Sequence, residues 1–145
     1  MRAGQLKLKV QLLCGDDLAI GPGKADLLEA IDREGSISGG GRAMGMSYRR
    51  TWLLVDTMNR CWTTPLVEAT PGGGQQKGAR LTDQGREVLT AYRTLEADLL
   101  TAADSPALSV LSGLLLADPK PPRQGVSPDT PSAGKSAGRP RKSDP

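Results

Sequence analysis

Glycine and serine residues divide residues 24–62 into three helical stretches, and this division constrains the fold more than any other feature of the chain. The first stretch carries leucine and isoleucine at helical spacing and stops at Gly35. Ser36 or Ser38 caps a second, shorter stretch, which Gly45 ends. The pattern therefore predicts three helices in succession, with a tight turn between the second and the third.

The third helix, predicted over residues 48–62, begins with the polar and cationic side chains of a DNA-reading element. Arginine is suited to bidentate contacts with guanine or phosphate, and an apolar side anchors the helix. The residues expected to reach the major groove are Ser47, Tyr48, Arg49, Arg50 and Thr51. On the preceding helix, backbone phosphates are expected at the helix N-terminus and at Ser36, Ser38 and Arg42. This arrangement predicts a helix-turn-helix.

Two short strands, predicted over residues 66–69 and 79–81, flank a Gly-rich polar loop and indicate a β-hairpin. We interpret residues 71–80 as a wing that contacts the adjacent groove or the DNA backbone. The side chains expected to make these contacts are Gln75, Gln76, Lys77 and Arg80. A phosphate-cradling nucleotide loop is the alternative, but the segment lacks the GKS/T ending and the strand-to-helix context of such loops.

A long helix, capped by Thr82, is predicted to run to about residue 103 with leucine and tyrosine at its apolar positions. Near the N-terminus, residues 6–13 alternate apolar and polar side chains, which predicts a half-buried strand. Residues 18–20 are a second strand that could pair back on it. The predicted fold is mainly α with a small β-hairpin wing: a winged helix-turn-helix with a long C-terminal helix and a disordered tail.

The composition predicts a domain over residues 1–104 and a low-complexity, largely disordered tail over residues 105–145. Within the tail, residues 106–117 are apolar enough to form one more turn or helix. A Gly-Arg-Pro sequence further on resembles the core of an AT-hook, which enters narrow A·T minor grooves. The side chains that would do so are Arg139, Arg141 and Lys142, and an ordinary basic tail is the alternative.

Residue types that the chain lacks exclude several classes of function. It has no histidine and two widely spaced cysteines, which removes most metal sites and every histidine-based catalytic mechanism. We therefore expect no enzyme activity, no metal and no cofactor. With no signal peptide or long apolar run, the chain is expected to be cytoplasmic, with no membrane partner. The net charge is only +3, so phosphate affinity must come from local clustering of arginine and lysine.

Five stretches of the chain together resemble a known family, and they are GPGKADLLEAID, GSIS, RAMGMSYRRTWLLVDTMNRC, PLVEATPGGG and GARLTDQGREVL. Residues 21–89, which contain them, resemble the N-terminal DNA-binding domain of ModE-type molybdenum-responsive regulators, relatives of the LysR-type winged helices. The resemblance implies a winged helix that binds double-stranded DNA. It also implies a homodimer joined through residues 83–103, and an exposed Leu/Tyr stripe predicted on that helix supports this.

Two departures from the family limit what the resemblance implies. Gly39, Gly40 and Gly41 stand where the family has an alanine-rich helix, and each Gly costs a helix about 0.5–1 kcal/mol relative to Ala. This helix would either be weak and order only on DNA, or use its small surface to approach the third helix closely. The family's molybdate-binding domains have no counterpart in the tail, so molybdate binding is not expected of this chain alone.

The main prediction is a sequence-specific DNA-binding transcription regulator. The alternative is a protein-interaction or architectural winged-helix module that binds DNA weakly or non-specifically. Among individual residues, Trp52 and Trp62 are expected in the core or in domain packing, and Cys61 as a half-buried thiol. For Lys24, a phosphate contact and a solvent-exposed position are both open.

Overall fold

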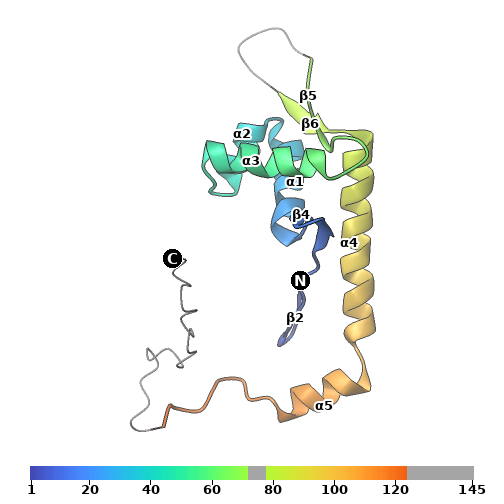
Figure 1. Ribbon diagram of the computed structural model, residues 1–145. Coiled ribbons are helices and arrows are strands. Elements are labelled where there is room, and N and C mark those ends of the chain that lie inside the picture. Colours follow the sequence, from blue (N-terminus) through green and yellow to red (C-terminus); the bar gives the residue numbers. More distant parts are fainter. Residues whose placement is uncertain (72–77, 124–145) are drawn as a thin grey trace, which may run out of the picture.

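The computed structural model describes residues 1–71 and 78–123 of the chain. Three helices, α1 (Pro22–Glu34), α2 (Ile37–Ala43) and α3 (Tyr48–Arg60), pack at one end of the molecule. They are followed by an antiparallel hairpin of β5 (Val67–Ala69) and β6 (Ala79–Leu81). The long helix α4 (Asp83–Ala103) starts beside this cluster and extends well beyond it (Figure 1). The predicted order of three helices, hairpin and long helix is thus confirmed.

Helix boundaries follow the capping residues closely. Ser36 accepts a hydrogen bond from the Gly39 amide at 2.9 Å, so Ser36 rather than Ser38 is the N-cap of α2. The predicted Thr82 cap of α4 accepts from the Gly85 amide at 2.9 Å. The predicted end of α3 is wrong by two residues, because the helix stops at Arg60.

The N-terminal segment is more irregular than predicted. It forms two small hairpins, from β1 (Arg2–Ala3) with β2 (Leu6–Lys7) and from β3 (Leu12–Cys14) with β4 (Asp17–Ile20). The predicted continuous strand over residues 6–13 is therefore wrong, whereas the second strand is confirmed. Between β2 and β3, the Val10 carbonyl accepts a hydrogen bond from the Tyr92 hydroxyl at 2.8 Å. A long-range contact with α4 thus takes the place of one strand-ladder bond.

The core lies between α1, α3, β4 and the β5–β6 hairpin. Its largest fully buried side chains are Ile20, Leu27, Leu28, Ile31, Thr51, Val55, Met58 and Leu66. Each buried aliphatic side chain contributes about 1.5–3 kcal/mol relative to an exposed one. The apolar stripe predicted on α1 is the centre of this core, which confirms the periodicity argument.

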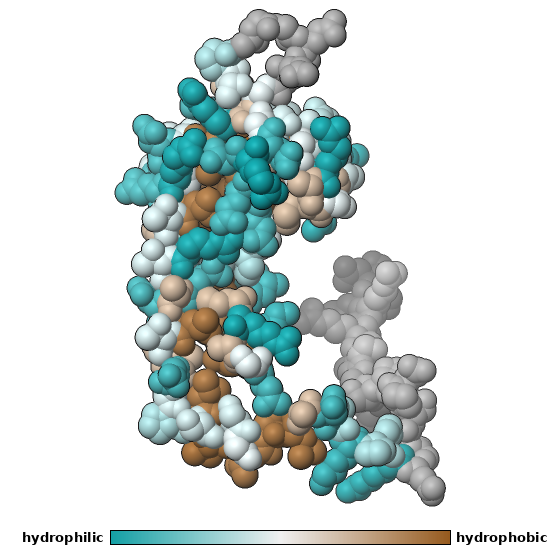
Figure 2. Space-filling model, turned by 180° about the vertical axis from the view of Figure 1, so that it is seen from behind, coloured by the Kyte–Doolittle hydropathy of each residue, from teal (hydrophilic) through white to brown (hydrophobic). Residues whose placement is uncertain are grey.

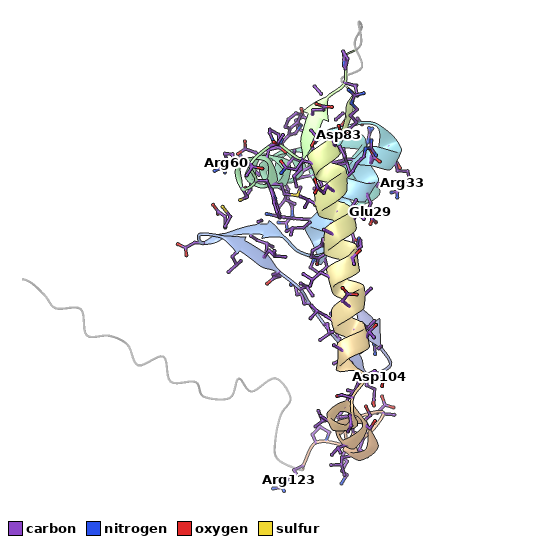
Figure 3. All side chains as sticks on the ribbon, turned by 90° about the vertical axis from the view of Figure 1, so that its right-hand side faces the viewer. Glu29, Arg33, Arg60, Asp83, Asp104 and Arg123 are labelled. Atoms are coloured by element: carbon purple, nitrogen blue, oxygen red, sulfur yellow. The ribbon has the colours of Figure 1, made fainter. Side chains whose placement is uncertain are left out.

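Two arginines of α4 form ion pairs with the acidic side of α1, which the sequence pattern predicted to be exposed to solvent. Arg86 forms a two-pronged ion pair with Asp32, at 2.9 and 3.1 Å. Arg93 donates to Asp26 at 2.7 Å, to Glu29 at 2.9 Å and to the nearly buried Glu96 at 2.8 Å. These hydrogen bonds raise the pKa of Arg93, and the bond to Glu29 contributes most to the rise. Figure 3 shows Glu29 beside α4, so these pairs fix how α4 leaves the domain.

The three consecutive glycines of α2 are buried within a regular helix. A Cβ on Gly40 would lie 2.6 Å from Ile31 Cγ1 and 2.9 Å from the Ile31 backbone nitrogen. A Cβ on Gly41 would lie 2.1 Å from Thr51 Oγ1. Of the two interpretations of these glycines, the structure supports close helix packing: α2 approaches both α1 and α3 more closely than alanine allows.

The last described element is α5 (Pro106–Leu114), a short apolar helix capped by Ser105. The helix considered for residues 106–117 is therefore present over most of that range. None of its residues is buried. Among the helices that the structure describes, none combines the length and apolar character needed to span a lipid bilayer.

Candidate nucleic-acid interface

A tight turn joins α2 to α3 and positions the start of α3 at the surface. Gly45 adopts a left-handed conformation with φ of 68°, and the Met46 amide donates to the Gly41 carbonyl at 2.9 Å. Ser47 then caps α3 by accepting a hydrogen bond from the Arg50 amide at 3.2 Å. The short polar side chains that the sequence identified thus fix the direction in which α3 leaves the turn.

The arginines at this surface differ from most others in the domain, of which only Arg2 likewise lacks an ion pair with a described residue. Arg42, Arg49 and Arg50 are exposed and form no ion pair with any residue of ranges 1–71 and 78–123. The arginines that do pair with carboxylates are Arg33, Arg60, Arg80, Arg86 and Arg93. The guanidinium groups of α2 and the start of α3 are therefore available for an external anion such as a phosphate.

A groove of about 1010 Å³ lies between the start of α2, one side of α3 and the β5–β6 hairpin. Of the residues predicted to contact DNA, the groove brings together Ser36, Ser38, Arg42 and Tyr48. Ser47, Arg49 and Arg50 do not line it, but they are exposed at the start of α3. These seven residues thus lie along α2, from its N-cap to its last turn, and at the start of α3.

Three carboxylates also line the groove, and each is matched by an arginine. Asp56 pairs with Arg60 at 2.9 Å, Glu68 with Arg80 at 3.0 Å, and Glu34 with Arg33 at 3.4 Å. These pairs are exposed, so each adds little to stability. Their effect on the site is to cancel much of the negative charge that would repel DNA.

Thr51 was predicted to reach the major groove, and this prediction is wrong. Its side chain is fully buried, packs on Gly41 and donates a 2.8 Å hydrogen bond from Oγ1 to the Ser47 carbonyl. Thr51 lies on the helix side that also carries Val55 and Met58, both buried. The i, i+4, i+7 spacing of these three residues was the signal for its inward position.

Trp52 was expected in the core or in domain packing, yet 40% of its surface is exposed. Its ring meets that of Tyr48 edge to face, with centroids 5.9 Å apart and an interplanar angle of 62°. Both rings line the groove. The expectation for Trp62 is confirmed, since that residue is half-buried against the core.

Two further expectations concern residues behind the interface. Lys24 is buried, its Nζ donates to the Leu18 carbonyl, and desolvation lowers its pKa, so neither a phosphate contact nor a solvent-exposed position is correct. Cys61 is half-buried as expected, burial raises the pKa of its thiol, and both Cys14 and Cys61 are free thiols.

The remaining predicted contact residues belong to the wing and the tail. Arg80 is described, and its guanidinium pairs with Glu68 on the neighbouring strand. Six further residues lie outside the described residues: Gln75, Gln76 and Lys77 of the wing tip, and Arg139, Arg141 and Lys142 of the tail.

Within the part of the chain that the structure describes, no three His, Cys, Asp or Glu side chains form a group that could hold a metal ion.

Three packed helices, a β-hairpin and exposed arginines at one helix start are consistent with a helical DNA-binding domain. No family model matches the sequence. The chain is 45% identical over 78 residues to "Molybdenum transport protein ModE" of Azotobacter vinelandii and 40% identical over 94 residues to "Molybdenum-pterin-binding protein MopA" of Rhodobacter capsulatus. It is 33% identical over 108 residues to "DNA-binding transcriptional dual regulator ModE" of Escherichia coli (strain K12).

These alignments cover 54%, 65% and 74% of this chain, but 29%, 34% and 39% of the respective relatives. The chain thus spans about a third of the length of the curated relatives it matches. Their names describe transport proteins, binding proteins and transcriptional regulators, and none of these three names an enzyme. The resemblance to ModE-type proteins is therefore confirmed as sequence similarity to proteins of that name.

Proposed function

We propose that this chain is a sequence-specific DNA-binding transcription regulator with a winged helix-turn-helix. In this proposal α2 and α3 are the helix-turn-helix, and the β5–β6 hairpin carries the wing. The observation that carries the proposal is the group of exposed arginines at α2 and the start of α3, which form no ion pair with described residues and lie beside a groove of matched charges. The name of the Escherichia coli relative, a DNA-binding transcriptional regulator, supports the same function.

Each element has a separate role in this proposal. Arg49 and Arg50, at the start of α3, contact base edges or phosphates in the major groove. Ser36 and Arg42 hold the DNA backbone beside it. The wing, residues 71–80, contacts the adjacent groove or backbone. The relatives' names refer to molybdenum, whereas our proposal for this chain is limited to DNA.

We also propose that two copies associate through α4. Leu95 and Leu99 on this helix are 38% and 41% exposed, and Leu12 and Leu13 add further exposed apolar surface. Figure 2 shows hydrophobic residues gathered toward the far end of the molecule, over α5 and the adjoining end of α4. Tyr92 does not belong to this stripe, contrary to expectation, because it is 2% exposed and bonded to Val10.

Selection from a pool of random DNA duplexes tests the proposed function. The full chain should enrich a defined sequence, and the affinity for it should fall with salt by about 0.9 log units per log unit for each phosphate contact. Arg49→Ala and Arg50→Ala should each weaken binding by about 1–3 kcal/mol. Arg2→Ala is the matched control, because Arg2 is also exposed and forms no ion pair with a described residue, but does not line the groove. Unchanged affinity in both α3 variants would refute the role of α3.

The second candidate is a protein-interaction module, which the exposed leucines of α5 favour. Val110, Leu111 and Leu114 are all more than half exposed, and no residue of α5 is buried. Such a module would bind DNA weakly and without enrichment of any sequence. The random-pool selection therefore separates the two candidates directly.

A further inference from the structure

We infer that Tyr48 and Trp52 form an apolar reader of thymine, which recognises the 5-methyl group of that base in the major groove. This inference rests on the proposed function and specifies which bases the groove side of α3 recognises. Arginine contacts alone would favour guanine or phosphate. An aromatic pair adds a different preference, for A·T pairs whose methyl groups face α3.

The first observation is where the chain places its few aromatic side chains. It has two Trp, two Tyr and no Phe. Tyr92 is buried and Trp62 is half-buried, so these two have structural positions. The other two, Tyr48 and Trp52, are 63% and 40% exposed, one helical turn apart at the start of α3. Aromatic surface is costly to leave in water, and here half of the chain's aromatic residues are left at the candidate interface.

The second observation is that the two rings support each other. Their edge-to-face contact, with centroids 5.9 Å apart, leaves both rings facing the groove. Such pairs are favourable in their own right and restrict the rotamers of both side chains. The rings therefore present a fixed apolar surface, which binds a methyl group at low entropic cost.

The third observation is the charge around the rings. Asp56 and Glu68, two of the carboxylates that line the groove with the rings, are each paired with an arginine. Arg42 and Arg49 lie on either side of Tyr48 in sequence and are free of ion pairs with described residues. Arg42 and Arg49 are thus available to phosphates and guanines, so the aromatic pair is not needed for those contacts. The aromatic pair fits the one apolar group that B-DNA presents in the major groove, the thymine methyl.

Deoxyuridine substitution tests the inference without altering the protein. A duplex enriched from the random pool by the full chain is resynthesised with deoxyuridine at each thymine in turn, which removes one methyl group. Loss of a contacted methyl should weaken binding about fourfold, the equivalent of one buried CH₂. In Trp52→Ala this discrimination between thymine and uracil should disappear. Tyr48→Phe, which keeps the ring, should retain it.

Leu53→Ala is the matched variant, because Leu53 is an exposed apolar residue of the same helix that does not line the groove. It should keep the preference for thymine. Equal affinity of the wild-type chain for thymine and uracil duplexes would overturn the inference and leave the regulator proposal standing. A Trp52→Ala chain that loses affinity but keeps the preference would overturn it too, since Trp52 would then only position its neighbours. If no sequence is enriched at all, the regulator proposal itself fails.

Discussion

Replacing Gly41 with alanine tests whether the glycines of α2 are required by helix packing. The new Cβ would lie 2.1 Å from Thr51 Oγ1 and 2.8 Å from Thr51 Cγ2. Thr51 cannot easily turn aside, because it is fully buried and Oγ1 donates to the Ser47 carbonyl. Adding a methyl group to a packed core costs about 1–3 kcal/mol, whereas Gly to Ala in a helix gains about 0.5–1 kcal/mol. We expect a net loss of about 1–2 kcal/mol.

Urea denaturation at one fixed protein concentration measures this loss, because self-association would otherwise shift the apparent stability. Gly23→Ala is the matched control: it makes the same change in α1, where nothing lies within 4 Å of the new Cβ, and should not destabilise. In a Thr51→Ala background, Gly41→Ala should reduce the free energy of unfolding by at least about 1 kcal/mol less, because the side chain that the new Cβ would strike has been shortened. A Gly41→Ala chain as stable as the wild type would refute the close-packing argument.

Two further predictions concern α4. Tyr92→Phe should cost about 1–2 kcal/mol by leaving the Val10 carbonyl without its donor, which thermal melting measures. Desolvation raises the pKa of Tyr92, so the native state keeps the phenol protonated to higher pH than the unfolded chain does. Its stabilising contribution is complete below pH 10 and is lost as the pH rises through the folded pKa, and the variant should lack this alkaline loss. Leu99→Glu should convert dimers to monomers in sedimentation experiments at unchanged helicity, and a variant that sediments like the wild type would contradict the α4 interface.

Helix boundaries were the most predictable part of the fold. Ser47 and Thr82 are caps in the structure as in the prediction, because a cap depends on a hydrogen bond to an amide three residues away. The strand over residues 6–13 was less predictable. Its alternating pattern was real, but the Tyr92 hydroxyl competes for a backbone group of this segment from 82 residues away.

At the candidate site, the exposure of the α3 arginines was predictable, whereas that of Thr51 and Trp52 was not. The polar start of α3 identified the exposed Arg49 and Arg50 correctly as surface residues. Thr51 follows them in sequence but lies inside, and a polar residue at a helix start does not show which way it points. Trp52 is the converse case, since tryptophan is usually buried and here lines an open groove.

The sequence by itself determined the three helices divided by glycine and serine breaks, the hairpin and the long helix, because capping and periodicity act within one or two helical turns. Only the tertiary structure decided how the helices that these breaks separate pack against one another. It showed that Thr51 lies against Gly41 and leaves no room for a larger residue there. It also showed that Arg93 pairs with α1, whereas Arg49 pairs with none of the described residues. Such contacts join residues far apart in the chain, and their distances depend on how whole helices pack, which no local pattern encodes.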